Sequence, residues 1–376
     1  MRDGERGRGM SRAGRVGVGV IGAGVISTEY LDNLTVFPDL EVLFVADLDP
    51  ARAKAQAEKY GVPGSGTVED LLADPGIEIV VNLTVPAAHV EVARKSLAAG
   101  KSVWTEKPFA LDRVSGKALL DEAARLGLRV ATAPDTFLGA GLQTALRLIE
   151  AGAIGTPLTA LALMQSPGPD SWHPNPEFLF QAGGGPLFDI GPYYLTALVQ
   201  TFGPVKRVTA AASTSRPVRV IGSGPRAGTE FDVTVPSHHG ALLEFGSGAS
   251  AQTVFSFQSH RSRALIEVSG TTGTIAFPDP NTFDGDCVLF DGADHDGRRV
   301  PAVGSTSTRG TGVAELAQAI RAGRTERASG ALAYHVLDTI VSIAESAEGG
   351  ETVAVRSSFE TAPPVPERWD PTVASL

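Results

Sequence analysis

Apolar runs and helix-forming segments alternate over the first 135 residues of the chain. Each run is apolar along most of its length, which is typical of a strand that is covered on both faces. The predicted strands are Val16–Ile21, Glu41–Ala46, Ile77–Asn82, Ser102–Thr105 and Arg129–Ala133. The predicted helices between them are Ser27–Thr35, Pro50–Tyr60, Val68–Ala73, His89–Ala99 and Leu111–Leu126. This alternation predicts an α/β domain with a doubly wound parallel sheet over residues 14–135.

The pattern changes after residue 136, where apolar and polar positions alternate along several segments. Such alternation is typical of antiparallel or mixed strands with one buried face. The predicted strands are Thr159–Gln165, Val205–Ala212, Ser237–Phe245, Ser250–Phe257, Arg263–Ser269 and Gly273–Phe277. The predicted helices are Leu142–Glu150, Phe188–Phe202, Gly312–Ala322 and Leu332–Glu348, and the Gly/Ser/Thr loops 222–228 and 304–312 are expected to be the most mobile. Residues 136–376 are therefore expected to form an α+β domain with a large open mixed or antiparallel sheet.

Composition narrows the possible classes of function. A chain of 376 residues is long enough for two domains, and its net charge of -10 argues against a surface that binds nucleic acid. The single cysteine, Cys287, excludes an intramolecular disulfide and a cysteine-based metal site. The acidic and histidine-containing segment 294–297 resembles a metal-binding motif but is interpreted as a short exposed turn. We therefore expect no metal.

The N-terminal region bears on where the protein works. Residues 1–13 carry several arginines and are expected to form a flexible tail. This basic start, followed by the apolar stretch 16–26, resembles a secretory signal. However, the stretch contains four glycines and serves fully as the first strand and turn of the predicted sheet. Because no apolar run approaches the roughly 18 residues of a membrane span, we expect a cytoplasmic protein without a membrane segment.

The first strand leads into a glycine-rich turn, Gly22-x-Gly24-x-x-Ser27, which opens the first helix. Gly22 allows a tight turn, and Gly24 allows the backbone, together with Val25 and Ile26, to approach a pyrophosphate. The free N–H groups at the helix start favour an anion. A strand before the motif and a helix after it make this a Rossmann dinucleotide-binding fingerprint, with serine in place of the third glycine.

An acidic residue, Asp47, ends the second strand 23 residues after Gly24. Its carboxylate is predicted to accept hydrogen bonds from the adenosine ribose, and it would repel a 2′-phosphate. The expected cofactor is therefore NAD, although the nearby Arg52 keeps NADP possible. Asp49, directly before Pro50, is predicted to be a helix N-cap rather than a ligand of the cofactor.

Two later strand ends are predicted to flank the nicotinamide. Thr84 and Pro86 follow the strand that ends at Asn82, and His89 opens the next helix. His89 has two open interpretations, a contact with the cofactor or a packed histidine at a helix start.

The segment Glu106-Lys107-Pro108 follows the next strand. Lys107 is expected to polarise a carbonyl and move a proton while hydride moves at carbon, helped by a pKa that falls when a lysine is partly buried. Pro108 is expected to fix the turn, and a cis peptide bond before it is one way in which it could do so.

A glycine turn at 183–185 precedes Asp189 and Tyr193, which are four residues apart at a predicted helix start. Residues at that spacing share one side of a helix, so the pair is predicted to face a common site. The alternative is that Asp189 is a first-turn charge that the helix dipole favours.

These motifs together resemble the Gfo/Idh/MocA oxidoreductase family, the group of glucose–fructose oxidoreductase and inositol dehydrogenase. The resemblance extends from Val16 to about residue 350. It implies hydride transfer between NAD or NADP and a sugar, cyclitol or related polyol or ketone. The family's EKP motif falls on Glu106, Lys107 and Pro108. Its D-x-x-x-H motif falls on Asp189 and position 193, where this chain has Tyr193 instead of histidine.

The resemblance implies that Lys107 polarises the reacting oxygen, Asp189 orients it and Tyr193 passes the proton. Because tyrosine has a reference pKa of about 10, Tyr194 or Lys107 remains an alternative for the proton step. Trp172 and His173 are predicted to cover the sugar ring, with ordinary loop packing as the alternative for the tryptophan.

Two other functions fit the same cofactor fold. Some relatives hold NAD tightly and achieve net glycoside hydrolysis by oxidation, elimination and re-reduction, and a few relatives only sense a dinucleotide. The retained Lys107 and Asp189 argue against a sensor. The resemblance also implies a homo-oligomer, a dimer or tetramer formed through the C-terminal sheet.

Overall fold

The computed structural model describes residues 14–292 and 296–376, and its N-terminal part is a six-stranded parallel sheet in the order β3-β2-β1-β4-β5-β6. The strands are β1 Val16–Ile21, β2 Leu40–Ala46, β3 Gly64–Gly66, β4 Ile79–Asn82, β5 Ser102–Thr105 and β6 Val130–Thr132. The helices are α1 Val25–Leu34, α2 Pro50–Tyr60, α3 Val68–Ala73, α4 His89–Ala98 and α5 Arg113–Leu126. All six residues of β1 are buried, as expected for a central strand covered on both faces. The prediction of a Rossmann-type parallel sheet is confirmed.

The strand order reverses between β1 and β4, which both pair with their neighbours in parallel. In sheets of this kind a ligand binds at that reversal, beyond the carboxyl ends of the strands. The turns after β1, β2, β4 and β5 meet at this edge, so the fold itself brings the predicted site segments together.

The second part contains a nine-stranded mixed sheet in the order β16-β15-β14-β13-β7-β12-β11-β8-β17. Its strands are β7 Pro157–Gln165, β8 Val205–Ser213, β11 His238–Phe245, β12 Ser250–Ser256, β13 Arg263–Gly270, β14 Thr274–Ala276, β15 Cys287–Phe290, β16 Arg298–Val300 and β17 Val353–Ala354. Among these pairs β7 and β12 run parallel, and the other pairs are antiparallel. The predicted large mixed sheet is confirmed.

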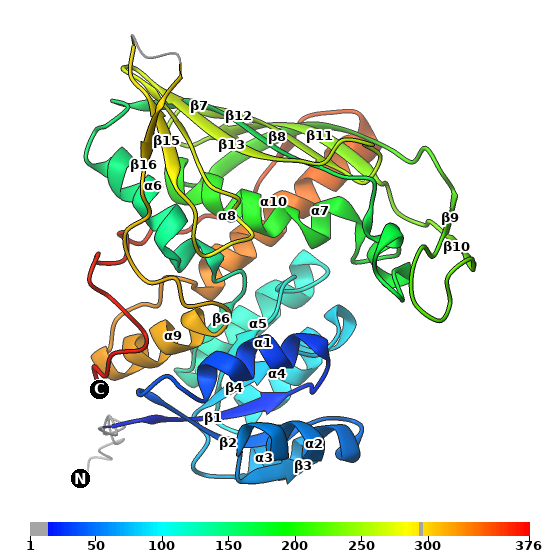
Figure 1. Ribbon diagram of the computed structural model, residues 1–376, viewed down its shortest axis with the longest axis vertical. Helices are drawn as coiled ribbons and strands as arrows, with labels where there is room; N and C mark the ends of the chain where they lie inside the picture. Colours follow the sequence, from blue (N-terminus) through cyan, green and yellow to red (C-terminus); the bar gives the residue numbers. More distant parts are fainter. Residues whose placement is uncertain (1–13, 293–295) are drawn as a thin grey trace, which may run out of the picture.

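A layer of helices lies between the nine-stranded sheet and the Rossmann sheet (Figure 1). These helices are α6 Ala140–Glu150, α7 Gly185–Asp189, α8 Gly191–Phe202 and α10 Gly330–Gly349. Helix α10 contacts both β8 above it and α5 below it, so it ties the two halves together. A small lobe with β9 Val218–Val220 and β10 Glu230–Asp232 extends from one side of this layer (Figure 1).

The last part of the chain returns to the Rossmann sheet. Helix α9 (Thr311–Ala322) lies beside α1, and Ser329 pairs with Ala131 at the sheet edge (Figure 1). Gly312 of α9 packs so closely on Trp104 that a Cβ at this glycine would lie 2.1 Å from the indole ring. The predicted domain boundary at residue 135 assigns α9 to the second domain. In the structure, however, α9 packs on the first domain.

Several boundaries differ from those predicted, each for a local reason. The predicted helix Phe188–Phe202 is two helices, α7 and α8, which break at Ile190. The helix predicted from Leu111 begins at Arg113, because the side chain of Asp112 caps it by accepting from the Ser115 amide. The short strands β3, β9, β10, β15, β16 and β17 were not predicted, since runs this short carry too little periodicity to be recognised. The 3₁₀ helices η1 Pro86–Ala88, η2 Thr136–Leu138, η3 Pro169–Ser171 and η4 Glu177–Phe180 are equally short.

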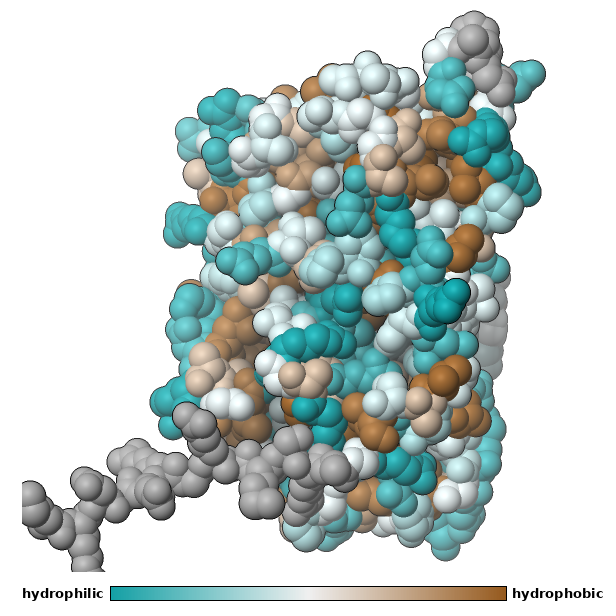
Figure 2. Space-filling view, turned by 90° about the vertical axis from the view of Figure 1, so that its left-hand side faces the viewer, coloured by the Kyte–Doolittle hydropathy of each residue, from teal (hydrophilic) through white to brown (hydrophobic). Residues whose placement is uncertain are grey.

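Polar and apolar residues are interspersed on the side of the molecule shown in Figure 2. Within the described ranges, no helix is both long and apolar enough to cross a membrane. The tail predicted at residues 1–13, and positions 294 and 295 of the acidic turn, lie outside the described residues.

Candidate active site

The glycine-rich turn after β1 forms an open cradle. Gly22 has a φ of +104°, and a Cβ at this position would lie 2.7 Å from the carbonyl oxygen of Leu83. Gly24 is the N-cap of α1, and a Cβ added there would meet nothing within 4 Å. The space beside Gly24 is therefore open, and the first turn of α1 has no side-chain cap among the described residues. This arrangement fits an anionic pyrophosphate, which the free N–H groups of a helix start attract.

Asp47 fixes the same turn from the end of β2. One of its carboxylate oxygens accepts from the Ala23 amide at 2.7 Å, and the other accepts from the Asp49 amide at 2.9 Å. Each carboxylate oxygen can accept a further hydrogen bond, so the residue can still take a ribose hydroxyl. Arg52 approaches it only to 3.9 Å and is more than half exposed. Asp49 accepts from the Ala51 and Arg52 amides, which confirms that it is the N-cap of α2.

Apolar side chains are exposed around this cradle. Val25 is 94% exposed, Leu48 97% and Val85 67%, and they follow Gly24, Asp47 and Thr84 respectively. Three exposed apolar side chains at one edge of the sheet are typical of a ligand-binding surface. Ile26 is half-buried against the core, and the Ser27 hydroxyl donates to the Gly24 carbonyl, so Ser27 closes the turn.

The loop after β4 is held by a buried histidine. His89 is 1% exposed, and its two ring nitrogens lie 2.9 Å from the Thr84 carbonyl oxygen and 2.8 Å from the Pro108 carbonyl oxygen. The Thr84 hydroxyl donates to Asn82, and Pro86 begins η1. This environment agrees with the packed-histidine interpretation, in which His89 joins the segments around Thr84 and Lys107. A direct contact between His89 and a cofactor stays a prediction.

Lys107 stands at the end of β5, before a cis peptide bond to Pro108. Its amine donates to a carboxylate oxygen of Asp189 at 2.6 Å and to the Asp189 backbone carbonyl at 3.0 Å. Burial by itself lowers the pKa of Lys107, but the negative charge of Asp189, with Tyr193 and Glu106, outweighs it and holds the pKa above its usual value. The expectation that partial burial lowers this pKa is therefore wrong, because the burial comes with a paired carboxylate. Lys107 is a permanent cation with one of its three N–H groups unused among the described residues.

Glu106 points away from that amine. One carboxylate oxygen accepts from the Tyr30 hydroxyl at 2.8 Å, and the other accepts from the Lys107 amide at 3.0 Å. The Trp104 indole in turn donates to the Tyr30 oxygen at 3.1 Å. Burial and the Glu106 charge hold the pKa of Tyr30 well above its usual value. Glu106 thus fixes the backbone that carries Lys107.

Tyr193 also lies close to the Lys107 amine, which is 5.7 Å from the centre of its ring. The prediction attributed the shared side of Asp189 and Tyr193 to one continuous helix. In the structure Asp189 ends α7 and Tyr193 lies in the first turn of α8, and the break at Ile190 does not separate them from Lys107. Asp189 is paired with Lys107, so the alternative of a lone first-turn charge does not describe it.

Sequence reasoning missed Arg309. Its guanidinium donates to the Tyr193 oxygen at 3.2 Å from a loop that was predicted only to be mobile. Burial raises the pKa of Tyr193, whereas the positive charges of Lys107 and Arg309 oppose that rise. Because 116 residues separate Arg309 from Tyr193, no local pattern could have indicated the contact.

The remaining predicted residues lie elsewhere. Tyr194 is 1% exposed and packs edge-on against Phe255 of β12. Its buried hydroxyl has no hydrogen-bond partner among the described residues. Trp172, 66% exposed, and His173 contact each other edge to face with ring centres 5.5 Å apart, and His173 contacts Phe178 in the same way. The contacts of Trp172 and His173 are to this aromatic cluster, and their role at a sugar ring stays a prediction.

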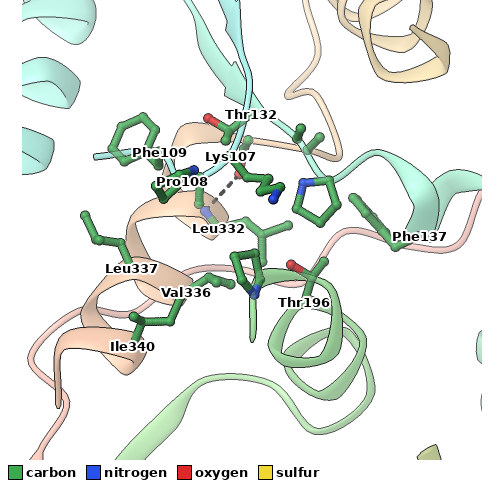
Figure 3. Close-up of a pocket in the computed structure, with 16 residues that line it drawn as sticks. Lys107, Pro108, Phe109, Thr132, Phe137, Thr196, Leu332, Val336, Leu337 and Ile340 are labelled. Carbon is green, nitrogen blue, oxygen red and sulfur yellow. Dashed lines mark hydrogen bonds between the residues drawn. The ribbon is translucent and has the colours of Figure 1, made fainter. Parts of the chain in front are cut away.

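A cavity of about 20 Å³ is lined by Lys107, Thr132, Thr196 and apolar side chains of α10 (Figure 3). This volume holds about one water molecule, so the cavity is packing space beside the lysine and not a substrate site. Within the described chain, no group of three or more histidine, cysteine, aspartate or glutamate residues is arranged to hold a metal ion.

A glycine cradle, an acidic residue after β2 and a paired lysine after β5, built on a Rossmann sheet, define an NAD-binding oxidoreductase. Residues 16–133 match the oxidoreductase family with an NAD-binding Rossmann fold, and residues 142–276 match the GFO/IDH/MocA C-terminal domain. The chain belongs to the Gfo/Idh/MocA family.

Curated relatives agree with this assignment, and a solved structure shares the fold. The chain is 28% identical over 265 residues to trans-1,2-dihydrobenzene-1,2-diol dehydrogenase of Bos taurus, covering 70% of this chain and 74% of that protein. It is 34% identical over 125 residues to inositol 2-dehydrogenase/D-chiro-inositol 3-dehydrogenase of Lactiplantibacillus plantarum, covering 32% of this chain and 35% of that protein. Its fold is similar to that of a levoglucosan dehydrogenase in complex with NADH and L-sorbose, with a TM-score of 0.80 at 23% identity over 92% of this chain and 100% of that one. At that identity the last likeness shows the fold alone.

Proposed function

We propose that the protein transfers hydride between NAD and a secondary alcohol or ketone of a sugar, cyclitol or related polyol. The observation that carries the proposal is the convergence of Lys107, Asp189 and Tyr193 at the edge of the sheet that also holds the glycine cradle. Curated relatives that are named as diol and inositol dehydrogenases support the substrate class.

The roles of the residues follow from their contacts. A bound nicotinamide supplies or accepts the hydride. The remaining N–H group of Lys107 polarises the reacting oxygen, and the Asp189 carboxylate holds the amine in place. Lys107 is held as a cation by its ion pair with Asp189, and Tyr193 lies beside that amine with a hydroxyl that can donate, so Tyr193 is the candidate for the proton step.

Preference for NAD over NADP belongs to the same proposal. The side chain of Asp47 is 11% exposed. Among the described residues, the nearest cation is Arg52, whose guanidinium lies 3.9 Å from the Asp47 carboxylate. A carboxylate in this position accepts the ribose hydroxyls and repels a 2′-phosphate.

The exposed face of the nine-stranded sheet supports a homo-oligomer. Leu161 of β7 and Leu242 of β11 flank Gln252 of β12 in one row across the strands, and the next row contains Leu163 and Val254. Leu161 is 39% exposed and Leu242 38%, so this apolar face is open in a single chain. We propose that it pairs with a second copy in a dimer or tetramer, which light scattering on the purified protein tests; a monomer at all concentrations would overturn this.

A screen of polyols with NAD, and of keto-sugars with NADH, tests the reaction by the absorbance of reduced nicotinamide. Oxidation of at least one polyol with loss of activity in Lys107→Ala supports the proposal. Turnover of a glycoside without net NADH formation would instead favour an oxidation–elimination–re-reduction route. Tight NAD binding with no turnover on any polyol, ketone or glycoside would favour a sensor.

A further inference from the structure

Arg309 joins three segments that are far apart in the sequence. Its guanidinium donates to the Tyr193 oxygen at 3.2 Å and to the Asn281 side-chain oxygen at 3.4 Å. Its Nε lies 3.5 Å from a carboxylate oxygen of Glu29, which is on the cofactor-side helix α1. The arginine side chain is 18% exposed. A mostly buried arginine in this position connects the predicted proton donor to the helix that opens the cofactor cradle.

The loop that carries Arg309 is held firmly. The Gly310 and Gly312 amides both donate to one carboxylate oxygen of Asp135, at 3.0 Å each. The Arg309 carbonyl accepts from the Asn33 side chain at 2.9 Å. The backbone at Arg309 and directly after it is thus anchored to the Rossmann domain, so the arginine is positioned before any ligand binds.

The direction of the hydrogen bond between Arg309 and Tyr193 limits what each group can do. A guanidinium only donates, so the Tyr193 oxygen must accept. The hydroxyl proton of Tyr193 then has no acceptor in the described part of the chain and is free to be given to a substrate oxygen. A donor and a positive charge at that oxygen stabilise a phenolate more than a neutral phenol.

We propose that Arg309 is a positioning residue for the proton donor: it holds the Tyr193 oxygen and stabilises the phenolate that remains after proton transfer. This inference rests on the proposed oxidoreductase function. In the direction of reduction, the carbonyl carbon gains a hydride, the carbonyl oxygen gains the Tyr193 proton, and the phenolate regains a proton from water. In the direction of oxidation, the phenolate accepts the proton of the substrate hydroxyl, and the C–H bond of the same carbon gives up a hydride, which a bound NAD would accept.

The charged groups around Arg309 and Tyr193 are of both signs. Tyr193 is influenced by the cations Lys107 and Arg309 and by the anions Glu106 and Asp189. Arg309 faces Glu106, Asp135 and Tyr30 in addition to Glu29. Lys107 is already paired with Asp189, and Arg309 is the cation that the Tyr193 oxygen contacts directly. Burial raises the pKa of Tyr193, and the charge of Arg309 opposes that rise.

Direct titration of Tyr193 tests the proposal without any assay of activity. The chain has five tyrosines, so tyrosine labelled with ¹³C at Cζ gives a simple NMR spectrum in which Tyr193→Phe identifies the Tyr193 signal. The wild type is compared with Arg309→Met, with Arg309→Lys, and with Arg299→Met, which removes an exposed arginine paired with Asp286. Spectra are recorded on the full chain with and without NAD.

Arg309→Met is expected to raise the pKa of Tyr193 by at least about one unit, a tenfold change in its ionisation constant. Arg309→Lys should restore part of that shift, and Arg299→Met should cause none. If the substrate screen succeeds, the pH at which kcat is half-maximal should move in the same direction, with a smaller change in KM. An unchanged Tyr193 titration in a folded Arg309→Met protein overturns the role of Arg309 even if the enzyme is active. A shifted titration in a protein that turns over no substrate supports the electrostatic contact and overturns the proposed reaction.

Discussion

The amine of Lys107 lies 2.6 Å from a carboxylate oxygen of Asp189, although the two residues are 82 positions apart in the chain. Lys107 follows strand β5 of the parallel sheet, and Asp189 ends a short helix of the layer that covers it. The ion pair therefore links the Rossmann sheet to the helix layer at the point where the proposed reaction would take place.

Replacement of Lys107 tests its role in polarising that oxygen. Lys107→Ala is expected to lower kcat by roughly 10²–10⁴, the usual contribution of a positioned proton-transfer or polarising group. Circular dichroism should show a folded protein, and Lys206→Ala, an exposed lysine of β8, serves as the control. Turnover at the wild-type rate in folded Lys107→Ala would remove the lysine from the mechanism.

Tyr193→Phe removes only a hydroxyl and tests the proton step. Because the ring remains, folding and NAD affinity should be retained, and turnover should fall by at least about tenfold, or about 1.4 kcal/mol of barrier. Tyr193→His should recover part of the activity and introduce a pH dependence near neutrality, where histidine titrates. If turnover and its pH profile are unchanged in Tyr193→Phe, the tyrosine is a wall of the pocket and Lys107 becomes the candidate for the proton step.

Cofactor choice is expected to depend on Asp47. The wild type should bind NAD more tightly than NADP, and Asp47→Ser should narrow or reverse this preference because the repelling carboxylate is gone. Since Asp47 also accepts from the Ala23 and Asp49 amides, Asp47→Asn is a useful second variant that removes the charge and keeps an acceptor. Dissociation constants for both cofactors decide the matter, and tighter binding of NADP by the wild type would contradict the prediction.

The open space beside Gly24 predicts a variant that folds but does not bind cofactor. In Gly24→Val the new side chain meets no protein atom at its Cβ but occupies the cradle, so the unfolding temperature should stay close to that of the wild type and NAD affinity should fall by more than about tenfold. Gly246→Val, where a Cβ meets only ordinary contacts at 3.5 Å, is the matched control. Calorimetric titration with NAD measures the difference; normal NAD affinity would place the pyrophosphate elsewhere.

The free energy of unfolding is expected to change with pH because Asp135 titrates. Burial raises the pKa of this carboxyl from 3.8 to about 6, against the lowering effects of the Gly312 and Gly310 amides and of Arg309. Between these two values the folded state holds a proton that the unfolded state has lost, so stability falls as pH rises through this range. Above about pH 6 the ionised Asp135 lowers the free energy of unfolding by about 3 kcal/mol.

Asp135→Asn removes this ionisation and keeps an oxygen that can accept from the two glycine amides. Its free energy of unfolding in urea should therefore change less than that of the wild type between about pH 4 and about pH 7. Asp121→Asn, an exposed carboxylate paired with Lys117, should follow the wild-type curve. Parallel curves for wild type and Asp135→Asn would show that Asp135 titrates normally.

The sequence predicted the Rossmann domain well because each feature that indicates it depends on residues close together in the chain. The apolar strands, the N-cap at Asp49 and the turn at Gly22 depend on neighbours within a few residues, and all are present in the structure. The raised pKa of Lys107 and the contact of Arg309 with Tyr193 depend on partners that are 82 and 116 residues away. Such partners become visible only when the tertiary fold is known.

The same distinction applies to His89. Its position at a helix start left two interpretations open. The carbonyl oxygens of Thr84 and Pro108 beside its two ring nitrogens favour the packed histidine, and the local pattern did not indicate the contact with Pro108, 19 residues away. Tyr193 and Tyr194 are adjacent in sequence, but successive residues of a helix point in different directions, so one faces Lys107 and the other faces the core.

The close contact between Gly312 and Trp104 has a consequence for how this architecture can be divided. Trp104 is fully buried, and α9, from the far end of the chain, packs directly on it. A fragment ending at residue 135 would expose this indole and lose the amides that satisfy Asp135, so it is not an autonomous nucleotide-binding module. If the second domain of this chain is exchanged for that of a relative, we therefore expect that helix α9 must stay with the first 135 residues, because the Rossmann part is completed only near the end of the polypeptide.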